Sequence, residues 1–218
     1  MKKHLLLFSV ISFLLPLIYS CKNQTKKENK PAIDIIQIIE KVNSNWQKNN
    51  PKHENSFWHR AAYHTGNMAV YDITHNEDVL AFSRAWAEHN KWMGAQSQDR
   101  ENWKYSYGET DDYVLFGDFQ TCFQVYIDFY NLDKDEMKIA RAKEVMEYQM
   151  STPNVDYLWW ADGLYMVMPV MTKMYKATGE EVYLEKLYEY FAYARDLMYD
   201  TESKLFYRDA KYIYPKHK

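Results

Sequence analysis

A helical hairpin that recurs three times is the feature that most constrains what this chain can fold into. Each copy has an amphipathic segment that ends in a tyrosine, a short polar turn rich in acids, and a second amphipathic segment. The three tyrosines are Tyr71, Tyr130 and Tyr175, at spacings of 59 and 45 residues. Such a hairpin cannot bury its apolar face alone, so the recurrence predicts stacked pairs of helices.

Apolar residues recur at helical spacing along most of the chain, with few glycines or prolines and almost no strand-like alternation. We therefore expect an all-α fold, either an open solenoid or a closed α/α toroid of inner and outer helices. In a toroid, the loops before the inner helices form one mouth, and this mouth would include Asp118, Asp162 and the neighbourhood of Tyr63. The predicted helices cover residues 33–48, 56–74, 77–93, 118–131, 135–150, 162–177 and 181–199.

The N-terminus has the pattern of an export signal rather than of a folded element. A short basic start precedes an apolar run over residues 5–18, which is too short for a comfortable membrane span. The ending Ile-Tyr-Ser-Cys resembles a bacterial lipobox, in which cleavage leaves Cys21 as a lipid-modified N-terminus. We expect an exported, lipid-anchored protein on the periplasmic or outer-membrane face of a bacterium. The expected divisions are a signal peptide over residues 1–20, a flexible tether over 21–32 and one domain over 33–218.

Charge and cysteine content argue against two classes of protein. The net charge of the 218 residues is −3 with no long basic block, which argues against nucleic acid as the main partner. Besides Cys21 there is only Cys122, so no disulfide framework is expected despite export. Aromatic residues make up 17% of the chain, and rings with polar edges line sites that stack on sugars, although they also build cores.

One carboxylate stands among large apolar rings at the predicted start of a helix. Trp159 and Trp160 come directly before Ala161 and Asp162. An acid held out of bulk water has a raised pKa and keeps its proton near neutral pH, as a general acid must. The alternative is structural: the helix macrodipole stabilises the acid, and the tryptophans pack in the core.

The segment over residues 158–179 resembles a known family. It reads W-A-D-G-L-Y-M from Trp160, followed by Pro169 and Y-K-A-T-G from Tyr175. This resembles the W-x-D-x-L-[FY]-M…P…Y-x-x-T-G signature of the unsaturated glucuronyl and rhamnogalacturonyl hydrolases, glycoside hydrolase families 88 and 105. Weaker similarities cover residues 60–68, 117–130 and 205–209. The resemblance implies a six-hairpin α/α toroid.

The resemblance also implies a substrate class: oligosaccharides whose non-reducing end is a 4,5-unsaturated uronic acid, of pectin or rhamnogalacturonan type. An acid protonates C4 of the vinyl ether, water adds at C5, and the hemiketal collapses to release the next sugar. Asp162 matches the family's general acid and base, and Asp118 matches its second aspartate, which orients the ring. No metal or organic cofactor is implied. The expected substrate-binding residues are Trp160, Trp159, Tyr63, His64, Gln124 and Tyr165.

The match around the second aspartate is partial. Phe119 stands where the family has a further aspartate, and the acidic pair at residues 111–112, Asp111 and Asp112, is a rival. We favour Asp118 because Gln124 fixes that register.

The chain stops at Lys218, about halfway around the implied toroid and before the family's R-G-N-G-W loop. Half a ring would expose a large apolar patch. We therefore expect either a truncated coding region or two copies that pair to close the ring.

Two other functions stay open. A catalytically dead remnant or sugar-binding module would keep the aromatic mouth and bind oligosaccharides regardless of Asp162. An inverting glycosidase on the same toroid would need a second carboxylate across a water-sized gap from Asp162.

Overall fold

The computed structural model describes residues 34–212. The chain divides into a unit that ends at Ile35 and a unit over Ile36–Lys218, and the packing below is that of the second unit. The expected signal peptide, the tether and the lipidation site at Cys21 lie outside the described residues. Within the described part, no helix is long and apolar enough to cross a membrane.

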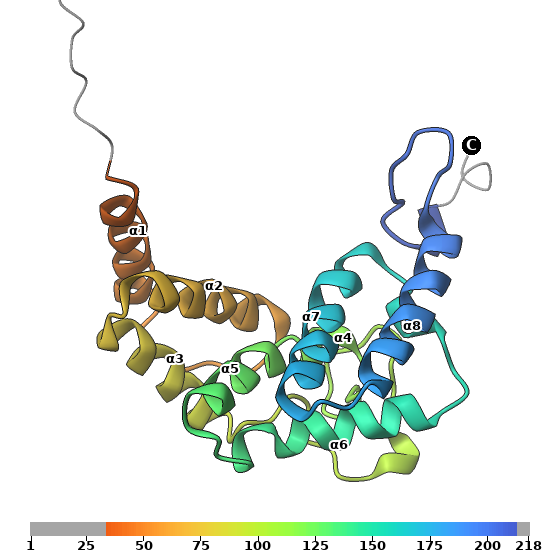
Figure 1. Ribbon diagram of the computed structural model, residues 1–218, viewed down its shortest axis with the longest axis horizontal. Coiled ribbons are helices and arrows are strands. Elements are labelled where there is room, and N and C mark those ends of the chain that lie inside the picture. The colour runs from red at the N-terminus through yellow and green to blue at the C-terminus, as the bar shows by residue number, and fades with distance from the viewer. Residues whose placement is uncertain (1–33, 213–218) are drawn as a thin grey trace, which may run out of the picture. The chain divides into compact units, whose positions relative to one another are not determined.

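Helices dominate the described residues, and the only β-pairing among them is two isolated bridges, so the all-α prediction is confirmed. Three helix pairs pack as hairpins: α2 with α3, α5 with α6, and α7 with α8 (Figure 1). The first helices of the hairpins also contact each other in chain order, α2 with α5 and α5 with α7. The α-helices are α1 Ile35–Asn49, α2 Trp58–Thr74, α3 Glu77–His89, α4 Gly117–Gln120, α5 Phe123–Asp133, α6 Met137–Ser151, α7 Ala161–Thr178 and α8 Val182–Met198. The 3-10 turns are η1 Arg100–Asn102, η2 Asp156–Leu158 and η3 Ala210–Tyr212.

The three hairpin turns share one backbone geometry. Four residues after each tyrosine, the backbone is left-handed and its N–H donates to the tyrosine carbonyl. This is the αL cap that ends many helices, and glycine adopts it at the lowest cost. The pairs are His75 with Tyr71 (φ 50°, 2.7 Å), Lys134 with Tyr130 (φ 59°, 2.7 Å) and Gly179 with Tyr175 (φ 79°, 2.8 Å).

The side chains of the turns repeat as well. The oxygen three residues after each tyrosine accepts from the backbone N–H five residues after it, so each turn is closed by the same local bond. These bonds join Thr74 to Asn76, Asp133 to Asp135 and Thr178 to Glu180, at 3.3, 3.2 and 3.2 Å. The repeat in the sequence is therefore a repeat of turn geometry.

Two predicted helices end earlier or break. The helix expected over 77–93 ends at His89, because Lys91 and Trp92 adopt positive φ values of 54° and 58°. The helix expected over 118–131 is interrupted at residues 121–122. There the Thr121 hydroxyl donates to the Gly117 carbonyl at 3.0 Å, an example of a side chain that competes with the helix ladder.

Candidate active site

The starts of α2, α4 and α7 meet in the structure. The α4 turn packs against both α2 and α7. Phe57, directly before α2, contacts Phe119 of α4 with ring centroids 4.8 Å apart. Asp118 lies in the first turn of α4, and Asp162 lies in the first turn of α7. The structure thus brings the two aspartates to one end of the first helices of the hairpins.

The ring of Trp160 packs closely against residues that flank the two aspartates. Trp160 is 6% exposed and its indole lies against Gly117, where an added Cβ would be 3.0 Å from the ring. A Cβ on Gly163 would lie 3.2 Å from the same ring. Gly117 precedes Asp118 and Gly163 follows Asp162, so a larger residue at either position would crowd the Trp160 ring. The ring of Trp160 is thus largely covered by protein, and its role in substrate binding stays a prediction.

Asp118 is the carboxylate that the fold removes from water. It is 6% exposed, and burial raises its pKa to about 7, with further contributions from the charges of Asp162 and Glu109. Among residues 34–212, no hydrogen bond to its carboxyl group is found. An acid with this pKa holds a proton for a large part of the time at neutral pH.

Asp162 is exposed, so the expectation that the neighbouring tryptophans hold it out of bulk water is wrong. Trp160 precedes α7 with an extended backbone (φ −138°, ψ 155°), which turns its ring inward against Gly117. Asp162 follows within the helix and faces solvent. The acid of this pair that is held out of bulk water is therefore Asp118 and not Asp162.

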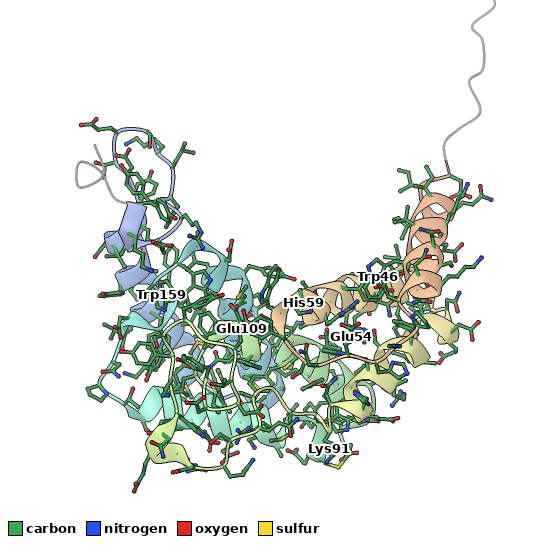
Figure 2. The ribbon with its side chains drawn as sticks, turned by 180° about the vertical axis from the view of Figure 1, so that it is seen from behind. Trp46, Glu54, His59, Lys91, Glu109 and Trp159 are labelled. Atoms are coloured by element: carbon green, nitrogen blue, oxygen red, sulfur yellow. The ribbon has the colours of Figure 1, made fainter. Side chains whose placement is uncertain are left out.

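Glu109 is a third acid of this region that the sequence did not single out. It is exposed on the loop before α4, and its carboxylate accepts a hydrogen bond from the Tyr107 hydroxyl at 3.2 Å. In the view of Figure 2, Glu109 lies between Trp159 and His59. Its negative charge is one of those that raise the pKa of Asp118. The sequence gives one indication of Glu109, which is its place in the acidic run over residues 109–112, upstream of Asp118.

The rival acids Asp111 and Asp112 hold this loop in shape. Asp112 forms an ion pair with Lys104 at 2.5 Å, and Lys104 keeps the pKa of Asp112 below its usual range. Asp111 accepts from the Gln96 backbone N–H at 3.1 Å. The structure therefore pairs Asp162 with Asp118 rather than with either of these residues.

Tyr63 and His64 lie in the packing of α1, α2 and α3, and their predicted role in sugar binding is not supported. Tyr63 stacks on Trp46 with centroids 3.3 Å apart and donates to Asn43 at 2.6 Å. His64 is 3% exposed, and its Nδ1 lies 2.9 Å from the Ser83 hydroxyl. Burial raises the pKa of Tyr63 to about 12 and lowers that of His64 to about 3, so both stay neutral at pH 7.

Gln124, which is also predicted to bind substrate, is buried and bonds to α7. Pro169 has no N–H, so the Tyr165 carbonyl one turn earlier in α7 lacks its helical donor. The buried Gln124 amide donates to this carbonyl at 3.0 Å and to the Met166 carbonyl at 3.2 Å. Gln124 thereby joins the second hairpin to the third.

Tyr165 and Trp159 remain open to a ligand. Tyr165 is 49% exposed, one turn after Asp162, and its hydroxyl lies 2.8 Å from that of Thr65. Trp159 is half-buried and donates from Nε1 to the Tyr105 carbonyl at 3.3 Å. No group of three or more His, Cys, Asp or Glu side chains within the described range is arranged to hold a metal ion.

The segment over residues 205–209 lies against the start of α7. The Ala161 N–H donates to the Arg208 carbonyl at 2.8 Å, and Trp160 forms a bridge with Asp209. Asp209 is buried and its carboxylate accepts from the Lys211 N–H at 2.8 Å. The backbone directly before Asp162 is thus fixed by hydrogen bonds to residues 208–209 and by the packing of Trp160 on Gly117.

The family follows from comparison with known proteins. Residues 36–218 match the model of Glycosyl Hydrolase Family 88. The chain belongs to this family. The helical hairpins agree with the toroid fold of the family 88 structures.

Three similar proteins extend the comparison within and around family 88. One is an unsaturated 3S-rhamnoglycuronyl hydrolase of Formosa agariphila, 24% identical over 163 residues that cover 72% of this chain and 41% of that protein. A solved structure described as a polysaccharide lyase is 65% identical, with a TM-score of 0.83 and coverage of 84% of this chain and 52% of that one. A family 88 glycosyl hydrolase from Bacteroides vulgatus is 54% identical, with a TM-score of 0.82 and coverage of 84% and 53%. The chain spans about half the length of these relatives or less.

Proposed function

We propose that this family 88 chain acts in the hydrolysis of oligosaccharides that end in a 4,5-unsaturated uronic acid, such as lyase products of pectin or rhamnogalacturonan. The observation that best supports this is the pairing of a buried acid, Asp118, with an exposed acid, Asp162, at one end of the first helices. The name of the Formosa agariphila relative, an unsaturated 3S-rhamnoglycuronyl hydrolase, points to the same class of chemistry.

The reaction needs one proton and one water. A proton is added to C4 of the C4=C5 bond, and the resulting cation at C5 is stabilised by the ring oxygen. Water then adds its oxygen to C5 and returns a proton to the acid. The C5 hemiketal opens to a ketone, which leaves a hemiacetal at C1, and this hemiacetal collapses to release the next sugar.

The two acids suit different parts of this sequence. Asp162 faces solvent, so an incoming sugar meets it first, and it is the group placed to transfer the proton at C4 and to accept one from water. Asp118 lies near it and is protonated about half of the time at neutral pH, because burial raises its pKa to about 7.

A second candidate function comes from the solved structure described as a polysaccharide lyase. A lyase creates the unsaturated bond that the proposed hydrolase consumes, so the two activities change ultraviolet absorbance in opposite directions. A lyase needs a base. Asp118, whose pKa is raised to about 7, still holds a proton about half of the time at neutral pH and can support the proton donation that the hydrolase needs. We also propose that the protein is lipid-anchored through Cys21 on the periplasmic or outer-membrane face of a bacterium, as the lipobox-like sequence suggests.

The test is a reaction in D₂O with unsaturated rhamnogalacturonan oligosaccharides, followed by absorbance and by proton NMR. Loss of the C4=C5 absorbance, with one deuterium at C4 of the first sugar released, is the expected result. A released sugar that still has its vinylic C4 hydrogen would indicate attack at the anomeric carbon instead. A rise in absorbance on intact polysaccharide would indicate a lyase, and binding without turnover would indicate a sugar-binding module.

A further inference from the structure

We propose that a shallow cleft beside Trp159 binds the sugars that lie beyond the first one on the reducing side of the cleaved bond, an inference that rests on the proposed function. The cleft has a volume of about 540 Å³, within the range of about 300–1,000 Å³ that is typical of small-ligand sites. Its lining comes from the loop before α4 and from the segment before α7, and consists of Trp103, Lys104, Tyr105, Ser106, Asp156 and Trp159.

The cleft combines aromatic walls with polar edges. Trp159 and Tyr105 are both half-buried, and each presents part of a ring to the cleft. A pyranose ring has an apolar face of C–H groups that stacks on such rings, and an edge of hydroxyl groups that hydrogen-bonds. The Asp156 carboxylate, which accepts from the Tyr105 hydroxyl at 3.2 Å, and the exposed Ser106 hydroxyl supply partners for that edge.

Hydrogen bonds hold the walls in place without a ligand. The Trp159 indole donates to the Tyr105 carbonyl at 3.3 Å, and its ring lies 4.8 Å from that of Trp160. Lys104 bonds through its backbone to Asp112 at 2.8 Å and to Leu115 at 3.0 Å. A site whose walls are already ordered loses little conformational entropy when a sugar binds.

The wall of the cleft is packed close to the residues that flank the aspartate pair. Trp159 is followed by Trp160, whose ring rests on Gly117 directly before Asp118. The unsaturated ring is the non-reducing end of its chain, so only the reducing-side sugars continue beyond the ring that lies over Asp162. The neighbouring cleft is where the sugars after the first reducing-side one would contact the protein, and a disaccharide has none of these.

The experiment compares kcat/KM for an unsaturated rhamnogalacturonan disaccharide and tetrasaccharide. Two variants remove the cleft in different ways: Trp159→Ala deletes one aromatic wall, and Ser106→Trp fills the cleft from an exposed position. The matched control is Tyr188→Ala, which removes a 67% exposed ring on α8 that does not line the cleft. Thermal unfolding shows that each variant is folded.

We expect both cleft variants to lower kcat/KM for the tetrasaccharide about tenfold, the effect of losing one stacking contact, and to change the disaccharide value less than threefold. Tyr188→Ala should change neither value. Equal losses on both substrates, or a tetrasaccharide preference that survives in Ser106→Trp, would overturn the proposal.

A second measurement keeps this result separate from the proposed function. Saturated rhamnogalacturonan oligosaccharide, which has no bond to hydrolyse, is titrated while tryptophan fluorescence is followed. Binding that Ser106→Trp abolishes supports the cleft even if no lyase product is turned over. Failure of the unmodified chain to bind overturns the cleft and leaves the hydrolase to be judged by the D₂O experiment.

Discussion

The start of α7 and the middle of α2 both place polar side chains among aromatic rings, and the sequence predicts sugar-binding residues in both. Around α2, the polar groups satisfy one another: Asn67 accepts from Asn43 at 2.8 Å and donates to Ser83 at 2.7 Å. At the other region, Asp118 is buried with no hydrogen bond found among the described residues, next to an exposed Asp162. Satisfied polar groups stabilise a fold, whereas an unsatisfied acid with a shifted pKa is available for chemistry.

The comparison predicts its largest effect at the exposed acid. Asp162→Asn should lower kcat on unsaturated oligosaccharides by about 10³-fold, because the proton transfer at C4 loses its donor. The melting temperature should stay within a few degrees, because Asp162 is exposed. The assay is the rate at which C4=C5 absorbance is lost. A loss of less than tenfold would remove Asp162 from the chemistry.

In the α2 region, a substitution is expected to lower stability and to leave kcat nearly unchanged. Asn67→Ala should lower the free energy of unfolding by about 2–4 kcal/mol, because it removes the buried hydrogen bonds of the Asn67 side chain with Asn43, Val79 and Ser83. The kcat of the folded fraction should change less than twofold. Urea unfolding and kinetics on the same preparation measure the two quantities. A large fall in kcat with normal stability would place the α2 region in the active site.

Asp118→Asn should affect activity and stability in opposite directions. The pKa of Asp118 is raised to about 7 in the folded state from an ordinary value of 3.8, so the folded state binds the proton more tightly. Its contribution to stability is therefore full below about pH 4 and is lost as the pH rises to 7. Since Asn removes this loss, we expect the melting temperature to rise by about 2–4 °C at pH 8 and not at pH 4.

The same substitution should lower kcat by about 10²-fold. Asp111→Asn, at an exposed acid of the neighbouring loop, is the control and should show neither effect. Equal destabilisation by Asp118→Asn at both pH values would show that the pKa of Asp118 is not raised by burial.

The hydrogen bond from Gln124 to the Tyr165 carbonyl can be tested with a double-mutant cycle that pairs Gln124→Ala with Pro169→Ala. Gln124→Ala should cost about 1–3 kcal/mol of unfolding free energy, because the Tyr165 carbonyl then lacks any donor. Pro169→Ala restores a helical N–H at that carbonyl, so in this background the cost should fall by about 0.5–1 kcal/mol. Urea unfolding of the four proteins gives the coupling. Additive effects would mean that Gln124 and Pro169 do not share this carbonyl.

The smallest effect is expected at Glu109. Glu109→Gln removes one of the negative charges that raise the pKa of Asp118, so that pKa should fall. The alkaline limb of the kcat/KM profile should move to lower pH by less than one unit. A pH-rate profile from pH 5 to 9 measures the shift. An unchanged profile, or a shift to higher pH, would show that Glu109 does not act on Asp118.

The sequence predicts the hairpins well because their signals are local. A tyrosine, a capping oxygen three residues later and a turn within the next few residues all lie within one short segment. Both aspartates are predicted at the starts of helices for the same reason. The helix ends at His89 and Gln120 are missed, because left-handed backbone at Lys91 and a side-chain bond from Thr121 override the apolar periodicity.

The predicted site residues divide by how far away their partners lie. From the sequence, Gln124 is predicted to contact substrate. In the structure its amide donates to the Tyr165 carbonyl, which is free to accept because Pro169, in another hairpin, has no N–H. His64 is predicted to lie at the mouth of the toroid, but its Nδ1 hydrogen-bonds to the Ser83 hydroxyl on α3. Glu109 is not singled out at all, because a loop without periodicity does not indicate which helix start it will lie against.

The sequence alone determined the class of fold, the positions of the three turns and the placement of Asp118 and Asp162 at the starts of first helices. Only the tertiary structure decided which of these acids is buried. Trp160 turns its ring onto Gly117, a residue from a different hairpin, and Asp118 is enclosed while Asp162 faces water. Helical periodicity depends on neighbours within a few residues, whereas the pKa of a carboxyl group depends on everything packed around it.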